Sequence, residues 1–323
     1  MGNFVTPFDM IGASDAEQYG GKGANLGELT RAGFRVPRGF CLKADAYQYF
    51  LEKSGLEPRI RDLASNLVGR DLDGVTRITA QIQGLIIKTP IPPDVRADVA
   101  DYYYLISPVS KATAVAVRSS NSALATGITS FPGMMDTFYY IQGEDSVLQT
   151  VKHCWASLWN TRAVMDRIHR GVDHFAMRIA PVIQEMIGAD SAGVIFTANP
   201  VNQSRDEMAV DANWGLGESV VSGNRPTDFF LLDKASLSVK KRFINRKTHM
   251  VVWDESSGTG SRVVEIPPAR ADQPTLDDHQ LKELGAVALR VESHYGGVPQ
   301  DVEWAFQKGE LFLLQTRKIS TLK

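Results

Sequence analysis

The protein has 323 residues, enough for two domains or one large domain with a sizeable core. Its formal net charge of −2 gives no electrostatic reason to expect binding to nucleic acid or to an anionic membrane. We expect no secretory signal, no membrane-spanning helix and a cytoplasmic location, with Cys41 and Cys154 as inert core thiols because they have no metal-binding spacing.

The N-terminal half of the sequence predicts mainly helices. The expected elements, in chain order, are a glycine-rich turn that opens a helix (14–34), an extended segment (36–42), a capped helix that stops at Gly55, a mostly helical stretch interrupted by the prolines of "KTPIPPD" (56–105) and a short buried strand (112–120). The following segment, "NSALATGITSFPGMMDTF", is too long for a simple connector and is typical of a mobile lid. Alternatively, Met134 and Met135 are ordinary core methionines.

The C-terminal half predicts mainly strands. One amphipathic helix is expected over 146–170, and from about residue 180 seven apolar segments separated by turn residues indicate successive strands. A helix over 275–295 and a terminal hairpin follow. We therefore expect an α+β protein made of two parts, 1–188 and 189–323.

The terminal hairpin, "DVEWAFQKGELFLLQTR", constrains its own register if one of its faces is buried. The large apolar side chains of both strands must then share that face, because a slip of one residue turns them all outward. This condition places Trp304 opposite Leu314, with an odd-length loop around Lys308, Gly309 and Glu310.

The same register predicts a polar cluster on the other face of the hairpin. Glu303 is expected opposite Gln315, and Asp301 opposite Arg317. Carboxylates two residues apart on a strand suit a hard cation beside phosphate oxygens, and a guanidinium neutralises phosphate charge. The alternative is a solvated face with a cross-strand Asp–Arg pair.

Two basic residues of the N-terminal half are candidates for binding an anion. Lys22 lies in "GGKGAN", where glycines let backbone amides approach an anion at the start of a helix. Arg118 ends the buried strand of "AVRSSN" and needs a partner or an anionic ligand. The alternatives are a glycine turn without function and a structural salt bridge.

Two further segments have features that suit a nucleotide. In "PVIQEMI" the polar pair Gln184–Glu185 lies amid apolar residues, and adenine needs a slot with apolar walls and polar edges. Glu218 of "GLGE" lies on a glycine-framed turn and is a candidate ribose or metal contact. The alternatives are a core strand with an exposed polar pair and a plain turn.

Together and in order, these motifs resemble the ATP-binding (ATP-grasp) domain of the phosphoenolpyruvate synthase and pyruvate phosphate dikinase family, which includes rifampin phosphotransferase. The matching pieces run from residue 20 to residue 317 and are "GGKGANLGELTRAGFRVPRGF", "AVRSS", "FPGMMDTF", "VIQEMI", "AGVIFTANP", "GLGE" and "DVEWAF…LFLLQTR". Each piece alone is weak, but seven in this order are specific. The resemblance implies an ATP-grasp fold of two subdomains with the nucleotide cleft between them, and it implies ATP and Mg²⁺ as cofactors.

The resemblance also implies roles for individual positions. The implied catalytic residues are Lys22, Arg118 and Arg317, which would hold the ATP phosphates. In the implied cofactor-binding set, the lid covers the phosphates, residues 184–187 line the adenine slot and Glu218 lies near the ribose. The residues of this set are Lys22, Arg118, Gly133, Met134, Asp136, Thr137, Gln184, Glu185, Met186, Ile187, Glu218, Gln315 and Arg317. The implied metal ligands are Asp301, Glu303 and Gln315.

The sequence departs from the family pattern in two places. Where synthase-like relatives carry an acidic stretch after Arg-Ser-Ser, this chain has "NSALAT" and then a dikinase-like "PGMMDT", so the subtype does not predict the fate of the γ-phosphate. Full-length relatives continue after the Gln-x-Arg motif into a swivelling domain with a phosphorylated histidine and an acceptor-substrate domain. None of the six histidines here lies in a recognisable phosphohistidine motif. We therefore expect a free-standing ATP-binding subunit, as in split enzymes such as phenylphosphate synthase.

The expected activity needs a separate partner subunit that carries the phosphohistidine. The chain would transfer the β-phosphoryl or a pyrophosphoryl group of Mg-ATP to that histidine, giving AMP and phosphate. The partner would then phosphorylate a small hydroxyl or enol acceptor such as a phenol or cresol. The alternatives are a non-catalytic ATP-binding regulatory subunit, an ATP-grasp ligase that forms ADP, and a piece of a longer synthase or antibiotic phosphotransferase.

Overall fold

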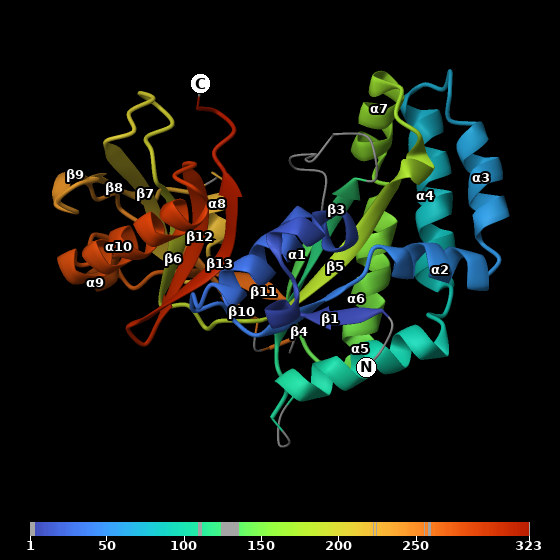
Figure 1. Ribbon diagram of the computed structural model, residues 1–323, viewed down its shortest axis with the longest axis horizontal. Coiled ribbons are helices and arrows are strands. Elements are labelled where there is room, and N and C mark those ends of the chain that lie inside the picture. The colour runs from blue at the N-terminus through green and yellow to red at the C-terminus, as the bar shows by residue number, and fades with distance from the viewer. Residues whose placement is uncertain are drawn as a thin grey trace. The chain divides into compact units, whose positions relative to one another are not determined.

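The chain divides into two compact units. The structure, a computed structural model, describes residues 4–108, 112–123, 136–221, 223, 225–254, 256–257 and 260–322. Unit 1 comprises Met1–Arg31 and Arg38–Met186, and unit 2 comprises Ala32–Pro37 and Ile187–Lys323 (Figure 1). This division falls close to the one expected after residue 188, but it also assigns the short segment 32–37 to unit 2, which no sequence pattern indicated.

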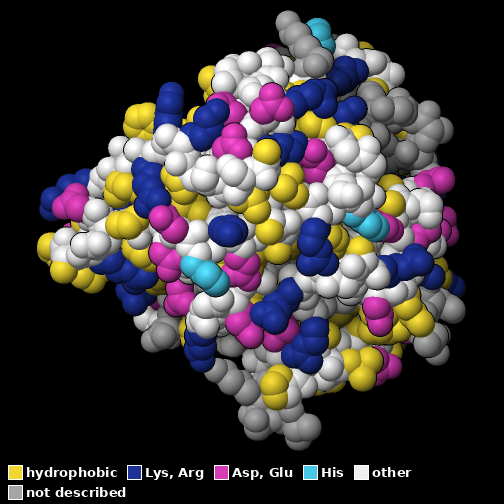
Figure 2. All heavy atoms as spheres, turned by 60° about the vertical axis from the view of Figure 1, so that its left-hand side comes forward, with side chains coloured by type: hydrophobic (Ala, Val, Ile, Leu, Met, Phe, Trp, Pro, Cys, Tyr) yellow, Lys and Arg dark blue, Asp and Glu magenta, His cyan; other side chains and the backbone are white. Residues whose placement is uncertain are grey.

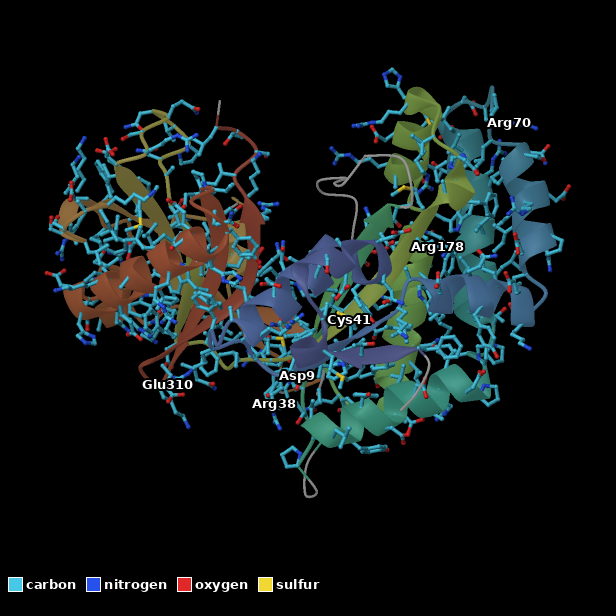
Figure 3. All side chains as sticks on the ribbon, in the orientation of Figure 1. Asp9, Arg38, Cys41, Arg70, Arg178 and Glu310 are labelled. Atoms are coloured by element: carbon cyan, nitrogen blue, oxygen red, sulfur yellow. The ribbon has the colours of Figure 1, made fainter. Side chains whose placement is uncertain are left out.

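The segment 32–37 joins unit 2 through the terminal hairpin. The amide of Leu313 donates to the carbonyl of Arg35 at 2.9 Å. The Arg35 guanidinium forms an ion pair with Glu310 at 3.2 Å and lies 5.6 Å from the centre of the Phe312 ring. Figure 3 labels Glu310 at the tip of the hairpin. Because these partners lie near the other end of the chain, local sequence gives no signal for them.

Unit 1 is built on a five-stranded antiparallel sheet in the order β1-β2-β5-β3-β4. Its strands are β1 (Val5–Pro7), β2 (Gly39–Leu42), β3 (Val115–Ala123), β4 (Thr137–Ile141) and β5 (Met177–Glu185). Its α-helices are α1 (Ala16–Arg31), α2 (Asp45–Lys53), α3 (Glu57–Ser65), α4 (Leu72–Lys88), α5 (Pro93–Ile106), α6 (Glu144–Ser157) and α7 (Thr161–Arg170). These elements confirm the helical N-terminal half and the strand expected over 112–120.

The two faces of the unit 1 sheet are covered by different helices. Ser120 of β3 contacts α1, whereas the hydroxyl of its neighbour Ser119 lies 3.3 Å from that of Ser157 on α6. Successive residues of a strand point to opposite faces, so α1 and α6 pack on opposite sides. Helix α4 packs on α6 and α3 on α4, which builds a thick helical layer on that side (Figure 1). The main apolar core lies within these layers.

The single helix expected over 146–170 is wrong. The chain forms α6 and α7, and between them Asn160 has an extended backbone (φ −59°, ψ 133°). Both helices bury apolar residues in the same core, which is why one periodic pattern runs through both. Arg167 of α7 then folds back to donate to the carbonyl of Leu158.

Unit 2 is built on a six-stranded antiparallel sheet in the order β13-β12-β6-β7-β8-β9, with a separate β10–β11 pair. Its strands are β6 (Ser191–Phe196), β7 (Glu207–Trp214), β8 (Asp228–Asp233), β9 (Val239–Phe243), β10 (His249–Trp253), β11 (Ser261–Glu265), β12 (Gln300–Gln307) and β13 (Glu310–Lys318). Its helices are α8 (Glu218–Val221), α9 (Pro268–Ala271) and α10 (Asp278–His294), and α10 packs against β12 (Figure 1). The strands and the helix expected after residue 180 are therefore confirmed.

The terminal hairpin has the predicted polar register but not the predicted apolar one. Glu303 pairs with Gln315 and Asp301 with Arg317, as expected. Trp304 pairs with Leu313 instead of Leu314, because a β-bulge lies between Glu303 and Trp304.

The hairpin turn explains this difference. The predicted odd-length loop is a two-residue turn, in which Lys308 and Gly309 both have positive φ (51° and 80°). Such a turn matches the twist of the strands. The core face consequently takes Leu311 and Leu313 from β13, while Phe312 and Leu314 pack on the opposite face.

Within the described residues, no helix is both long enough and apolar enough to cross a bilayer. On the face drawn in Figure 2, basic and acidic side chains are interspersed, in keeping with the net charge of −2.

Candidate functional site

In unit 1, Lys22 is attached to the strand that carries Arg118. The Lys22 ammonium donates to the carbonyl of Ser119 at 2.9 Å, and the Lys22 amide donates to the Ser120 hydroxyl at 3.1 Å. Ser119 and Ser120 directly follow Arg118 on β3. The two predicted cationic residues thus meet at one strand, although they are far apart in sequence. We call Lys22, Arg118, Ser119, Ser120 and Gln184 the β3 centre.

The glycine turn of "GGKGAN" differs from the expectation that its amides face an anion. Gly20 has a positive φ of 67° and interrupts α1, so the long part of the helix begins just after it. The amides of Lys22 and Gly23 both donate to the Ser120 hydroxyl, at 3.1 and 3.4 Å. These two donors of the first turn are therefore occupied within the protein, and the role of Lys22 in binding an anion stays a prediction.

Arg118 and Gln184 form the buried side of the β3 centre. Only 8% of the Arg118 surface and 3% of the Gln184 surface is exposed, and Nη1 of Arg118 lies 3.5 Å from Oε1 of Gln184. Within the described part of the chain, the Gln184 Nε2 atom has no hydrogen-bond partner. A buried amide donor without a partner costs about 1–3 kcal/mol. The pattern favours a ligand acceptor beside Arg118, and it differs from the alternative of an exposed Gln–Glu pair.

The other residues expected to line the adenine slot have separate environments. Nε and Nη2 of Arg38 lie 3.0 and 3.3 Å from the Glu185 carboxylate (Arg38 is labelled in Figure 3). Met186 donates its amide to the carbonyl of Ala114. Ile187 belongs to unit 2, where it packs with a small apolar cluster. The predicted segment therefore spans the division between the units, and its role in binding adenine stays a prediction.

Of the predicted lid residues, Gly133 and Met134 lie outside the described residues. Asp136 and Thr137 lie where the chain re-enters the sheet. The Asp136 carbonyl accepts the amide of Ser119 at 3.2 Å, and Thr137 pairs with Arg118 across β3 and β4. The C-terminal end of the predicted lid is thus hydrogen-bonded to the β3 centre.

In unit 2, Asp301 and Arg317 form the cross-strand pair that was the alternative interpretation of the hairpin. Nη2 and Nε of Arg317 lie 2.7 and 2.8 Å from the same oxygen of Asp301. The Asp301 side chain is 7% exposed and the Arg317 side chain 64%. Burial raises the pKa of Asp301, and the adjacent guanidinium opposes this shift. Arg317 therefore remains open to solvent on one side while it is oriented by a buried carboxylate.

The predicted metal ligands Glu303, Gln315 and Asp301 all lie on the terminal hairpin. Glu303 and Gln315 lie opposite each other on neighbouring strands, with Asp301 two residues from Glu303 along the same strand. Among the described residues, no group of three His, Cys, Asp or Glu side chains gathers around one point. Mg²⁺ does not need such a cage, because it usually takes one or two carboxylates and completes its shell with water and substrate phosphates.

Two polar residues that the sequence reasoning missed lie on the same face of this sheet. Asp211 is joined through Val194 to Glu303 by direct strand pairing, so the three share one face. Burial raises the pKa of the Asp211 carboxyl. Asn213, two residues on, is fully buried, and its Nδ2 atom has no partner in the described structure. The alternation of Asp and Asn in "VDANW" was the available signal.

Glu218 begins the short helix α8 and is half-buried. Its carboxylate accepts a hydrogen bond from Ser261 of β11 at 3.0 Å. This contact orients Glu218 within unit 2, and its approach to a ribose stays a prediction.

The chain belongs to a family of nucleotide-binding domains. Residues 16–323 match the family described as the pyruvate phosphate dikinase AMP/ATP-binding domain. The match covers almost the whole chain and agrees with the mixed helix and strand content, so the fold is the α+β ATP-grasp type. The predicted family and fold class are confirmed.

Curated relatives carry the names of two kinds of enzyme. The chain is 39% identical to the probable phosphoenolpyruvate synthase of Methanocaldococcus jannaschii and 35% identical to the phosphoenolpyruvate synthase of Pyrococcus furiosus, each over 99% of its own length. It is 33% identical to the rifampicin phosphotransferase of Bacillus subtilis over its full length. The alignments span 27%, 44% and 36% of those relatives, so the chain covers less than half of each.

Proposed function

We propose that this chain is the ATP-binding part of a dikinase-type phosphotransferase that acts with a phosphohistidine-bearing partner subunit. The AMP/ATP-binding family match and the names of the relatives support this proposal. The geometric observation that carries it is the β3 centre, where Lys22 donates to the residue after Arg118 and Arg118 lies beside Gln184. Among the described residues, the buried amide nitrogen of Gln184 has no hydrogen-bond partner. Two cations and an amide donor that gather at strand β3 from α1, β3 and β5 suit a polyphosphate chain.

The proposed reaction transfers a phosphoryl group of ATP to a histidine of the partner. A nitrogen of the partner's histidine bonds to the β-phosphorus of ATP, and the bond between that phosphorus and the bridging α-oxygen breaks with its electron pair going to AMP. Water then takes the γ-phosphoryl group as phosphate, which leaves phosphohistidine. The partner passes this phosphoryl group to a small hydroxyl or enol acceptor, which includes phenols and cresols. The names of the relatives do not identify the acceptor of this chain.

The residues of this chain contribute position and charge. Lys22 and Arg118 would neutralise phosphate oxygens in unit 1, and Arg317 would bind the terminal phosphate in unit 2. Glu303 and Gln315, with Asp301, would hold Mg²⁺. When bound, Mg²⁺ supplies charge neutralisation at the bridging phosphate oxygens.

The test is product analysis with and without the partner. The wild-type chain is mixed with Mg-ATP and a protein that supplies the phosphohistidine domain, and AMP, ADP and phosphate are quantified. We expect AMP only with the partner, and Arg317→Ala should lower its rate by about 10²–10³-fold. Arg246→Ala is the matched control, since Arg246 is equally exposed and pairs with an acid, Asp272, on the surface of the same unit.

The other products correspond to the alternatives. ADP formation would support an ATP-grasp ligase, and ATP binding without turnover under every condition would support a regulatory subunit. A normal AMP rate in Arg317→Ala would reject the assigned role of the hairpin.

A further inference from the structure

We propose that Ser120 is a positioning residue for the phosphate-binding lysine. Its hydroxyl replaces the missing helix cap at the glycine turn and thereby holds Lys22 beside Arg118. The inference rests on the proposed function and assigns a role to a residue for which the sequence analysis gave none.

Gly20 lies immediately before the long part of helix α1. Gly20 has φ 67° and ψ 169°, and helical backbone resumes after it. Gly20 is therefore the N-cap of the long part of α1, which makes Lys22 the second and Gly23 the third helical residue. The amides of these two positions have no carbonyl partner within the helix, and an N-cap side chain normally accepts a hydrogen bond from one of them. Glycine has no side chain to do so.

Ser120 supplies the missing acceptor from another element. Its Oγ accepts from the amides of Lys22 and Gly23 at 3.1 and 3.4 Å. Ser120 lies 98 residues from Lys22 in the sequence and is fully buried. A cap that is usually local is here a contact between helix α1 and strand β3 of the unit 1 sheet.

Gly20 has to be glycine for this contact to form. A Cβ atom on Gly20 would lie 2.1 Å from the Ser120 hydroxyl and 2.6 Å from the carbonyl of Asn121. Its positive φ would also strain any other residue. The neighbouring Gly21 has no such contact, because nothing lies within 4 Å of its would-be Cβ. The close approach is thus specific to Gly20 and Ser120.

Strand β3 binds Lys22 at both its backbone amide and its side-chain ammonium group. The Lys22 amide is bound by Ser120 and its ammonium donates to the carbonyl of Ser119 at 2.9 Å. Arg118 precedes these two residues on the same strand. One short stretch of β3 therefore sets the position of both proposed phosphate-binding cations. Loss of the Ser120 hydroxyl should free the turn and let Lys22 move relative to Arg118.

The test compares two serines of the same strand. Ser122 lies two residues from Ser120 on the same face, is also fully buried, and donates its hydroxyl to the carbonyl of Glu17 in the short first part of α1. Ser120→Ala and Ser122→Ala therefore remove the same group from the same kind of site. We measure the Kd of Mg-ATP for the full chain by calorimetry, together with the melting temperature. Ser120→Ala should weaken ATP binding by about 10-fold, and Ser122→Ala by less than about 2-fold, with similar shifts in melting temperature.

A double-mutant cycle with Lys22→Ala separates positioning from general loss of structure. If Ser120 acts through Lys22, adding Ser120→Ala to Lys22→Ala should change the Kd no further. Multiplying fold-losses, or equal effects of Ser120→Ala and Ser122→Ala, would overturn the inference. The outcome is separate from that of the proposed function, which depends on AMP formation by the wild-type chain. A wild-type chain that does not bind Mg-ATP would reject both.

Discussion

The β3 centre and the terminal hairpin assemble polar residues in two different ways. In the β3 centre, Lys22 reaches Ser120 across 98 residues of sequence through side-chain contacts to a buried strand. In the hairpin, Asp301 reaches Arg317 across 16 residues through strand register alone. A local strand register therefore follows from which residues are buried, whereas a contact between a helix turn and a strand depends on the packing of the whole unit.

The largest expected effect tests the register of the hairpin. Leu313 is 2% exposed on the core face opposite Trp304, and Leu314 is the half-buried residue next to it. Leu313→Ala should lower the free energy of unfolding by about 2–5 kcal/mol, because it leaves a cavity in the core. Leu314→Ala should cost about 1 kcal/mol. Urea unfolding of the two variants measures the difference. A larger loss of stability for Leu314→Ala than for Leu313→Ala would contradict the bulge and support the register that pairs Trp304 with Leu314.

The next largest expected effect is the loss of stability when the contact between Gly20 and the β3 centre is disrupted. Gly20→Ala introduces a methyl group into the Ser120 contact and strains a positive φ, so it should destabilise the protein by roughly 2–4 kcal/mol. Gly21→Ala, in the same turn but with open space around it, serves as the control and should change stability by less than about 1 kcal/mol. Thermal unfolding compares the two, and equal losses would show that the close approach of Ser120 has no energetic weight.

A smaller expected effect is the dependence of stability on pH that His174 causes. In unit 1, burial lowers the pKa of His174 from 6.5 to about 4, and the neutral ring accepts a hydrogen bond from Nε of Arg167 at 3.0 Å. Between pH 6.5 and about pH 4 the unfolded chain therefore binds more protons than the native chain. His174 contributes stability that is present above pH 6.5 and lost as the pH falls towards about 4, by roughly 1–3 kcal/mol.

Asp301 of the hairpin should respond with the opposite sign. Its pKa is raised in the native state, so its contribution to stability is present below the ordinary value of 3.8 and is lost as the pH rises through the native value. Urea unfolding between pH 7 and pH 4, with His174→Gln and Asp301→Asn as references, separates the two. Equal pH slopes for the wild type and His174→Gln would contradict the assignment to His174.

Sequence patterns were sufficient to predict elements that are defined by the spacing of their apolar residues or by a single turn. The helices of the N-terminal half, the strands after residue 180 and the pairings of Asp301 with Arg317 and Glu303 with Gln315 could all be predicted. The break between α6 and α7 could not, because both helices bury apolar residues in one core and the period alone does not record the turn at Asn160. The bulge of the hairpin could not be predicted either. The pairings of Asp301 with Arg317 and of Glu303 with Gln315 are the same whether Trp304 pairs with Leu313 or with Leu314.

Sequence alone determined the family, the α+β class and the identity of the charged residues, because these depend on residue type, order and short spacing. Only the tertiary structure decided that the amides of the glycine turn are bound by Ser120, that Gln184 is buried beside Arg118 and that the segment 32–37 joins unit 2. The physical reason is the separation of the interacting residues along the sequence. A hydrogen bond between residues far apart forms only after the intervening chain has packed, and no local pattern of polar and apolar residues encodes which hydroxyl will then meet which amide.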